Sequence, residues 1–199
     1  MAYLIPEPSI RASEEIVFEM FCEMNDRFLV TARRFLKSDE GQVEDFYYQF
    51  REQKKGVAMV HSITGHNGFT LRDLVSYDVK HNEANGEKNL DGTEYNYSWN
   101  CGAEGPSRKK EVREKRSSQE RNAFLMLMLG MASPRILSGD EFGNTQKGNN
   151  NAYCQDNAIT WLDWSLLEKN KELFSYVKKL IEFRRNHPLY QSRRYLTGF

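Results

Sequence analysis

Hydrophobic residues recur at a spacing of three and four positions in several stretches of the chain, which predicts amphipathic helices. The expected helices cover Ser13–Cys22, Asp26–Lys37, Asp39–Lys54, Thr70–Val79, Glu111–Ala132 and Ser165–Asn186. Two of them begin with the pattern of a capping box, Asp39 with Gln42 and Ser165 with Glu168. The stretch Ala123–Met131 is apolar nearly all round, so we expect this helix to be buried against a sheet.

Two short runs have the composition of β-strands. Val57–Thr64 is rich in branched and small residues, and Arg135–Ser138 is a shorter candidate after the break at Ser133 and Pro134. Each run leads into a polar loop, and the long segment 81–106 has no periodicity of either kind. Because helices alternate with strands that end in polar loops, the pattern predicts an α/β fold with a parallel sheet. Ligand-binding groups would then collect after the strands.

Composition and charge exclude several classes of protein. The 199 residues hold 28 Lys and Arg against 28 Asp and Glu, so no positive excess is present to bind nucleic acid. The apolar stretch at 123–132 is too short for a membrane span, and Met1–Glu7 has no cationic leader, so we expect a cytoplasmic protein. The three cysteines are far apart and are expected to be reduced thiols. We predict no metal and no cofactor.

Several longer blocks resemble the bacterial glycogen debranching and isoamylase branch of the α-amylase superfamily. The blocks include HNGFTL at 66–71, HNEANG at 81–86, SWNCG at 98–102 and GNNNAYCQDN at 148–157. The resemblance implies a portion of a (β/α)8 TIM barrel, with about strands seven and eight and their helices. We expect residues 1–199 to form one domain, the C-terminal part of that barrel, in which residues 1–24 are divergent.

The resemblance also defines the expected chemistry, which is retaining hydrolysis of α-1,6 linkages in α-glucans by a nucleophile and an acid about 5 Å apart. The family's earlier strands, with the nucleophilic Asp, have no expected counterpart here. The family motif HDGFTL carries an Asp that stabilises the transition state, and this chain has Asn67 in its place. Glu7, in a short match to the family's LIAEPW, is a candidate vestigial acid. The resemblance therefore predicts no competent catalytic set.

A chain that has lost its catalytic residues can still bind sugar, because binding needs only hydrogen bonds to the hydroxyl groups and an aromatic ring against the apolar sugar face. The expected substrate-binding residues are His66, Asn67, Trp99, Asp140, Glu141, Asn150 and Tyr153. For Asp140 and Glu141 we favour a structural role over sugar contact. For Trp99 and Tyr153, packing within their own loops is an equally strong explanation. The charged run from Arg108 to Arg116 is interpreted as a solvated helix face with i,i+3 and i,i+4 pairs.

Three hypotheses for function follow from these residues. The first is a fragment or degenerate homologue of a debranching glycoside hydrolase, inactive alone, with weak binding of glycogen or maltooligosaccharide. The second is half of a split enzyme that an N-terminal companion chain completes. The third is a protein without a glycan role that self-associates through open strand edges. A homo-oligomer is expected more readily than for an average domain, and neither nucleic acid nor membrane is an expected partner.

Overall fold

The computed structural model describes residues 21–52 and 57–191, and its sheet consists of parallel strands. The strands are β1 (Phe21–Met24), β2 (Val57–His61) and β3 (Ser133–Pro134), in the spatial order β1-β2-β3. Phe21 pairs with Val57 and Val60 pairs with Ser133. The predicted parallel α/β arrangement is therefore confirmed for these residues.

Two predictions need correction where the structure has strands. Phe21 and Cys22, predicted as the end of a helix from Ser13, belong to β1, and the rest of that predicted helix lies outside the described residues. A short apolar run has no decisive period, and here the backbone pairing with β2 decides. The third strand is Ser133–Pro134 rather than Arg135–Ser138. Proline is tolerated there because β3 lies at the end of the strand order.

The first two helices lie between β1 and β2 in the chain. Helix α1 (Asp26–Leu36) matches its prediction and begins at Asn25, whose Oδ1 accepts the Phe28 N–H at 3.0 Å. Helix α2 (Gln42–Arg51) lacks the predicted capping box: Gly41 is its N-cap, with no side-chain cap bond. Asp39 instead pairs with Arg34 at 3.2 Å.

The remaining helices also depart from the predicted bounds. They are α3 (Leu71–Leu74), α4 (Lys110–Leu129), α5 (Ser165–Lys169), α6 (Lys171–Asn186) and α7 (Pro188–Gln191), with short 3-10 turns η1 (Glu83–Asn85) and η2 (Asp140–Phe142). Helix α3 begins at the predicted cap Thr70 but ends five residues before Val79. The helix predicted from Ser165 is split at Asn170, and its predicted capping box is absent, because Asp163 accepts the Ser165 N–H at 2.9 Å.

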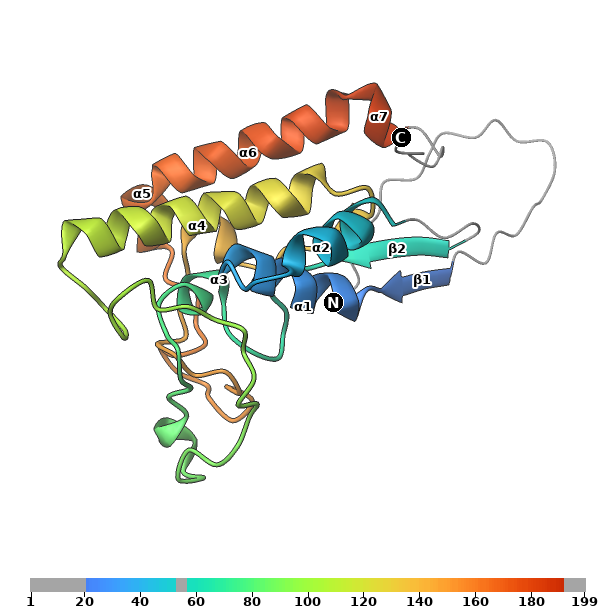
Figure 1. Cartoon of the computed structure of the whole chain (residues 1–199). Helices are drawn as coiled ribbons and strands as arrows, with labels where there is room; N and C mark the ends of the chain where they lie inside the picture. Colours follow the sequence, from blue (N-terminus) through green and yellow to red (C-terminus); the bar gives the residue numbers. More distant parts are fainter. Residues whose placement is uncertain (1–20, 53–56, 192–199) are drawn as a thin grey trace, which may run out of the picture.

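The core lies between helices rather than only against the sheet. Helix α4 packs mainly on α6 and α1, which corrects the expectation that its apolar half covers a sheet. Figure 1 shows α6 running alongside α4, on the side away from the strands. The buried hydrophobic cluster includes Phe28, Ala32, Ile63, Phe69, Leu71, Leu74, Phe124, Leu127 and Val177. Every helix in the described ranges is too short or too polar to cross a bilayer.

Two long loops account for the irregular part of the fold, as the sequence predicted. One joins α3 to α4 and contains η1, and the other joins η2 to α5. In Figure 1 these segments, coloured green and orange, lie together on the side of the molecule away from α6. Hydrogen bonds between them, such as Asn82 Nδ2–H to Asn150 Oδ1 at 2.8 Å, hold the two loops in place. The loops therefore form one ordered body beside the end of β2.

Candidate functional site

The loop that follows β2 presents two polar side chains to solvent. Within residues 61–71, all of which the structure describes, His66 and Asn67 are exposed and every other residue is buried. The turn at Gly68 has a φ of +100°, a conformation that favours glycine. Because this loop leaves the carboxyl end of a parallel strand, His66 and Asn67 lie where α/β folds place ligand-binding groups. These two predicted site residues are therefore accessible.

Asp140 lies inside the protein beneath this loop. One oxygen of its carboxylate accepts the Thr64 hydroxyl at 2.5 Å, and the other accepts the Leu71 N–H at 2.9 Å. Thr64 and Leu71 stand on either side of the exposed pair. Burial raises the pKa of Asp140 to about 7, and the two hydrogen bonds oppose this rise. The carboxylate holds both ends of the loop and has 2% of its surface exposed.

Glu141 is half-buried and closes its own turn. Its Oε2 accepts the Gly139 N–H at 2.9 Å, at the start of η2. A side chain that accepts a hydrogen bond from the residue two positions before it stabilises a local turn. This geometry agrees with the structural role that we favoured for the acidic pair.

Asn150 is also buried, and its side chain is used within the protein. Its Oδ1 accepts from Asn82, while its Nδ2 donates to the Thr93 carbonyl at 2.8 Å and to Asn96 Oδ1 at 2.9 Å. Its backbone carbonyl accepts the Gly68 N–H at 2.9 Å. Asn150 therefore connects both long loops to the loop that carries His66 and Asn67.

The two aromatic candidates differ in their surroundings. Trp99 is half-buried. Its backbone N–H donates to the Leu74 carbonyl at 3.0 Å, and the Lys115 ammonium lies 5.1 Å from its ring centroid. Trp99 thus joins its loop to α3 and α4. Tyr153 has 67% of its surface exposed, on the loop between η2 and α5. An exposed ring on an ordered loop is the form in which a sugar face can be stacked.

The exposed pair can form hydrogen bonds but offers no carboxylate. Double displacement at a glycosidic bond needs two carboxyl groups about 5 Å apart. His66 and Asn67 supply an imidazole and an amide, which donate and accept hydrogen bonds. Glu7, the candidate acid, lies outside the described residues. Among the residues that the structure describes, no group of three or more His, Cys, Asp or Glu side chains is arranged to hold a metal ion.

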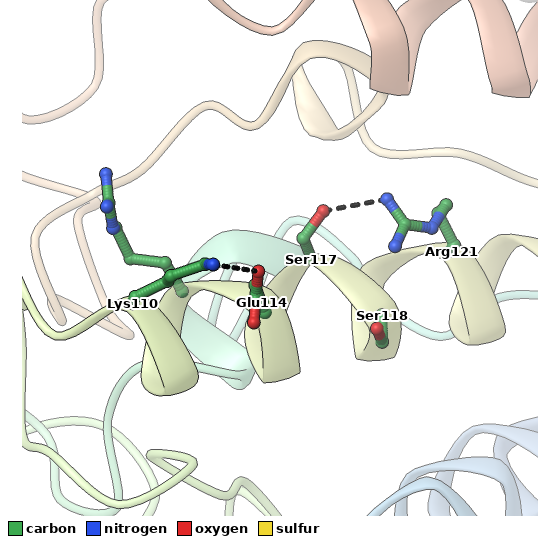
Figure 2. A pocket seen from close by; sticks show the side chains of 6 residues that line it. Lys110, Glu114, Ser117, Ser118 and Arg121 are labelled. Atoms are coloured by element: carbon green, nitrogen blue, oxygen red, sulfur yellow. Dashed lines mark hydrogen bonds and ion pairs between the residues drawn. The ribbon is translucent and has the colours of Figure 1, made fainter.

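A separate hollow lies along helix α4 (Figure 2). Its volume is about 620 Å³, and its lining residues all come from this helix: Lys110, Arg113, Glu114, Ser117, Ser118 and Arg121. Lys110 and Glu114 form an i,i+4 ion pair at 3.8 Å, and Arg121 donates to the Ser117 hydroxyl at 2.9 Å. The predicted solvated face and its i,i+4 pair are confirmed at Lys110 and Glu114. The prediction is wrong for Arg116, which is 5% exposed and donates hydrogen bonds to the carbonyls of Gly105 and Asn100. The hollow includes none of the predicted site residues.

Sequence reasoning missed the buried residues that support the exposed pair. Arg33 of α1 donates to the Ile63 carbonyl at 2.7 Å and to the Asn96 carbonyl at 3.1 Å. In the sequence, Arg33 stands beside Arg34, and because arginine is rarely fully buried, its burial was not predicted. For the supporting asparagines one sequence signal existed: Asn82 lies within, and Asn96 beside, blocks that resemble the family.

Relatives named for glycogen metabolism share much of this sequence, although no family model matches the chain. A protein named glycogen operon protein GlgX homolog from Mycobacterium tuberculosis is 40% identical over 187 residues, which cover 90% of this chain and 26% of that protein. A glycogen debranching enzyme from Klebsiella pneumoniae is 45% identical over 177 residues, which cover 85% of this chain and 27% of the enzyme. The chain spans about a quarter of the length of these relatives.

Solved structures show a likeness of fold. The pullulanase from Bacillus acidopullulyticus superposes with a TM-score of 0.60 at 19% identity, over 83% of this chain and 18% of the pullulanase. Pullulanase type I from Bacillus subtilis, solved with maltose, gives a TM-score of 0.59 at 20% identity, over 83% of this chain and 22% of that protein. The resemblance found in the sequence is confirmed: over most of its length the chain is homologous to one segment of the bacterial glycogen debranching enzymes.

Proposed function

We propose that this chain is a degenerate homologue of a debranching glycoside hydrolase that contacts α-glucan through the loop after β2 and does not cleave it. One observation carries the proposal: His66 and Asn67 alone are exposed within residues 61–71, at the carboxyl end of a parallel strand. We also propose that β2 and β3 correspond to strands seven and eight of the barrel found in the family. Both loops that follow these strands would then face the glucan.

The binding part of the proposal rests on hydrogen-bonding capacity and rigidity. An imidazole and a carboxamide can each donate to and accept from sugar hydroxyls. Their loop is held by Asp140 at Thr64 and Leu71 and by Asn150 at Gly68, so little conformational freedom is lost when a sugar binds. Tyr153, exposed on the neighbouring loop, supplies a ring on which a glucose unit can stack.

The absence of hydrolysis rests on Asn67. In the family motif HDGFTL the acid faces positive charge that develops in the transition state. The amide of Asn67 is neutral and cannot offset that charge, and one preorganised electrostatic group of this kind is commonly worth about 3 kcal/mol in catalysis. We therefore expect the chain to bind α-glucan without releasing reducing sugar.

Calorimetric titration with maltoheptaose, together with a reducing-sugar assay on glycogen and pullulan, tests both parts. His66→Ala and Asn67→Ala should each weaken maltoheptaose binding by about threefold to tenfold, the effect of losing one hydrogen bond. Asn122→Ala, which removes an exposed amide from α4, is the matched control and should leave binding unchanged. Hydrolysis by the unmodified chain alone, or equal binding by all three variants, would contradict the proposal.

A split enzyme remains the second candidate, because the chain spans about a quarter of its relatives' length. In that case a companion chain would supply the nucleophile and the acid. Reducing-sugar release on addition of a companion, with none from either chain alone, would place this alternative first. Self-association and a cytoplasmic location remain predictions, which gel filtration and cell fractionation would test.

A further inference from the structure

A ring of hydrogen bonds lies beneath the exposed His66–Asn67 pair and begins at Arg33. The Arg33 guanidinium donates from Nε to the Ile63 carbonyl at 2.7 Å and from Nη1 to the Asn96 carbonyl at 3.1 Å. Asn96 Oδ1 then accepts from Asn150 at 2.9 Å, and the Asn150 carbonyl accepts the Gly68 N–H at 2.9 Å. The ring thus grips the chain before the exposed pair, at Ile63, and after it, at Gly68.

Arg33 is the member of the ring that comes from a regular element. It projects from α1. Because Phe28 and Ala32 of the same helix are fully buried in the core, the backbone that carries Arg33 is held in place. Arg33 is itself 5% exposed. Its Nη2 lies 3.9 Å from the point that a Cβ on Gly68 would occupy, which places the guanidinium directly under the turn. Arg33 therefore ties the loop to α1, in addition to the hydrogen bonds that Asp140 accepts from Thr64 and Leu71.

The chemical type of the residue suits this task. Guanidinium donors lie in one plane in a fixed fork, so a single group can reach two carbonyls from two different loops. Burial lowers the pKa of Arg33 to about 10, and the nearby charge of Asp140 opposes this fall, so the side chain stays charged at neutral pH. Burying a charge costs stability unless the charge is hydrogen-bonded. For Arg33 the hydrogen bonds to the Ile63 and Asn96 carbonyls offset that cost.

We infer that Arg33 is a positioning residue, which sets the place and order of His66 and Asn67 without touching the sugar. The inference deepens the proposed function, and its affinity test rests on that function. It predicts that loss of the guanidinium disturbs the loop even where the core remains intact. A methionine of similar length would fill the space without a buried charge, but it would leave the Ile63 and Asn96 carbonyls without this donor, so some stability is lost as well.

Two-dimensional NMR of the free, full chain measures the positions of the His66 and Asn67 amide signals, and titration with maltoheptaose measures affinity. Arg33→Met should shift and broaden both signals and weaken maltoheptaose binding by about tenfold. Arg33→Lys, which keeps the charge but loses the fork, should fall between Met and the parent. Arg34→Met, on the exposed side of the same helix, should change neither measurement.

Asn96→Ala provides a second test if Arg33→Met does not fold. This change keeps the carbonyl that Arg33 binds but breaks the ring at the Asn150 contact. It should shift the same two amide signals, with a smaller loss of affinity. Unmoved loop signals and parental affinity in folded Arg33→Met, or in Asn96→Ala and Arg33→Lys together, would overturn the inference. If the signals move but no protein binds maltoheptaose, the positioning role holds and the proposed glucan binding fails.

Discussion

Removing the Asn150 side chain is the sharpest test of how the loops are held together. Asn150→Ala deletes three side-chain hydrogen bonds, those with Asn82, Thr93 and Asn96. A buried hydrogen bond contributes about 1 kcal/mol net, so the expected loss in the free energy of unfolding is about 3 kcal/mol. Asn82 still donates to the Asp91 carbonyl at 3.0 Å, which limits the further penalty of unpaired groups. A loss of this size is a large part of the stability of an ordinary domain.

Urea unfolding and hydrogen exchange together provide the assay. The midpoint should fall with an unchanged slope if the loops unfold with the core. If the loops open separately, the loss should appear as faster exchange of the Gly68 amide, which the Asn150 carbonyl accepts. Asn122→Ala on α4 is the control and should change stability by less than about 0.5 kcal/mol. A loss below about 1 kcal/mol with parental exchange at Gly68 would show that the Asn150 side chain does not hold the loops together.

Three further predictions concern buried groups. Burial raises the pKa of Asp140 from its ordinary value of 3.8 to about 7, so the folded chain binds this proton more tightly and the contribution of Asp140 to stability falls as pH rises between these values. Urea midpoints from pH 4 to pH 8 should therefore show that falling component in the parent and not in Asp140→Asn; identical pH profiles would disprove it. Arg72→Ala leaves Glu120 buried without its partner at 2.9 Å and should cost about 3–5 kcal/mol, whereas Glu120→Gln should cost less. Equal urea midpoints for these two variants would count against a charge effect. Phe28→Ala should cost about 3–5 kcal/mol by calorimetry, since the ring is fully buried and stacks on His61 at 3.8 Å; a loss under 1 kcal/mol would show that the site collapses.

Local pattern was sufficient for the elements whose signal is contained in a few neighbouring residues. The periodicity of 26–37 predicted α1 almost to the residue, and Thr70 was identified as the cap of α3. The long polar loops were also predicted, because segments without periodicity rarely form regular elements. The resemblance to the family then identified residues 66–67 as site candidates, because they lie in the block HNGFTL, which matches a family motif.

Long-range contacts decided what the sequence could not. Phe21 and Cys22 form a strand because β2 offers hydrogen bonds along their backbone. Val43 is exposed although it has the helical spacing of the apolar residues Phe46 and Phe50. The ring from Arg33 through Asn96 and Asn150 joins residues that are far apart in the chain, so no local pattern could show it. The chain's own residues thus determined which groups are offered to a ligand, and the tertiary structure determined which buried groups hold them there.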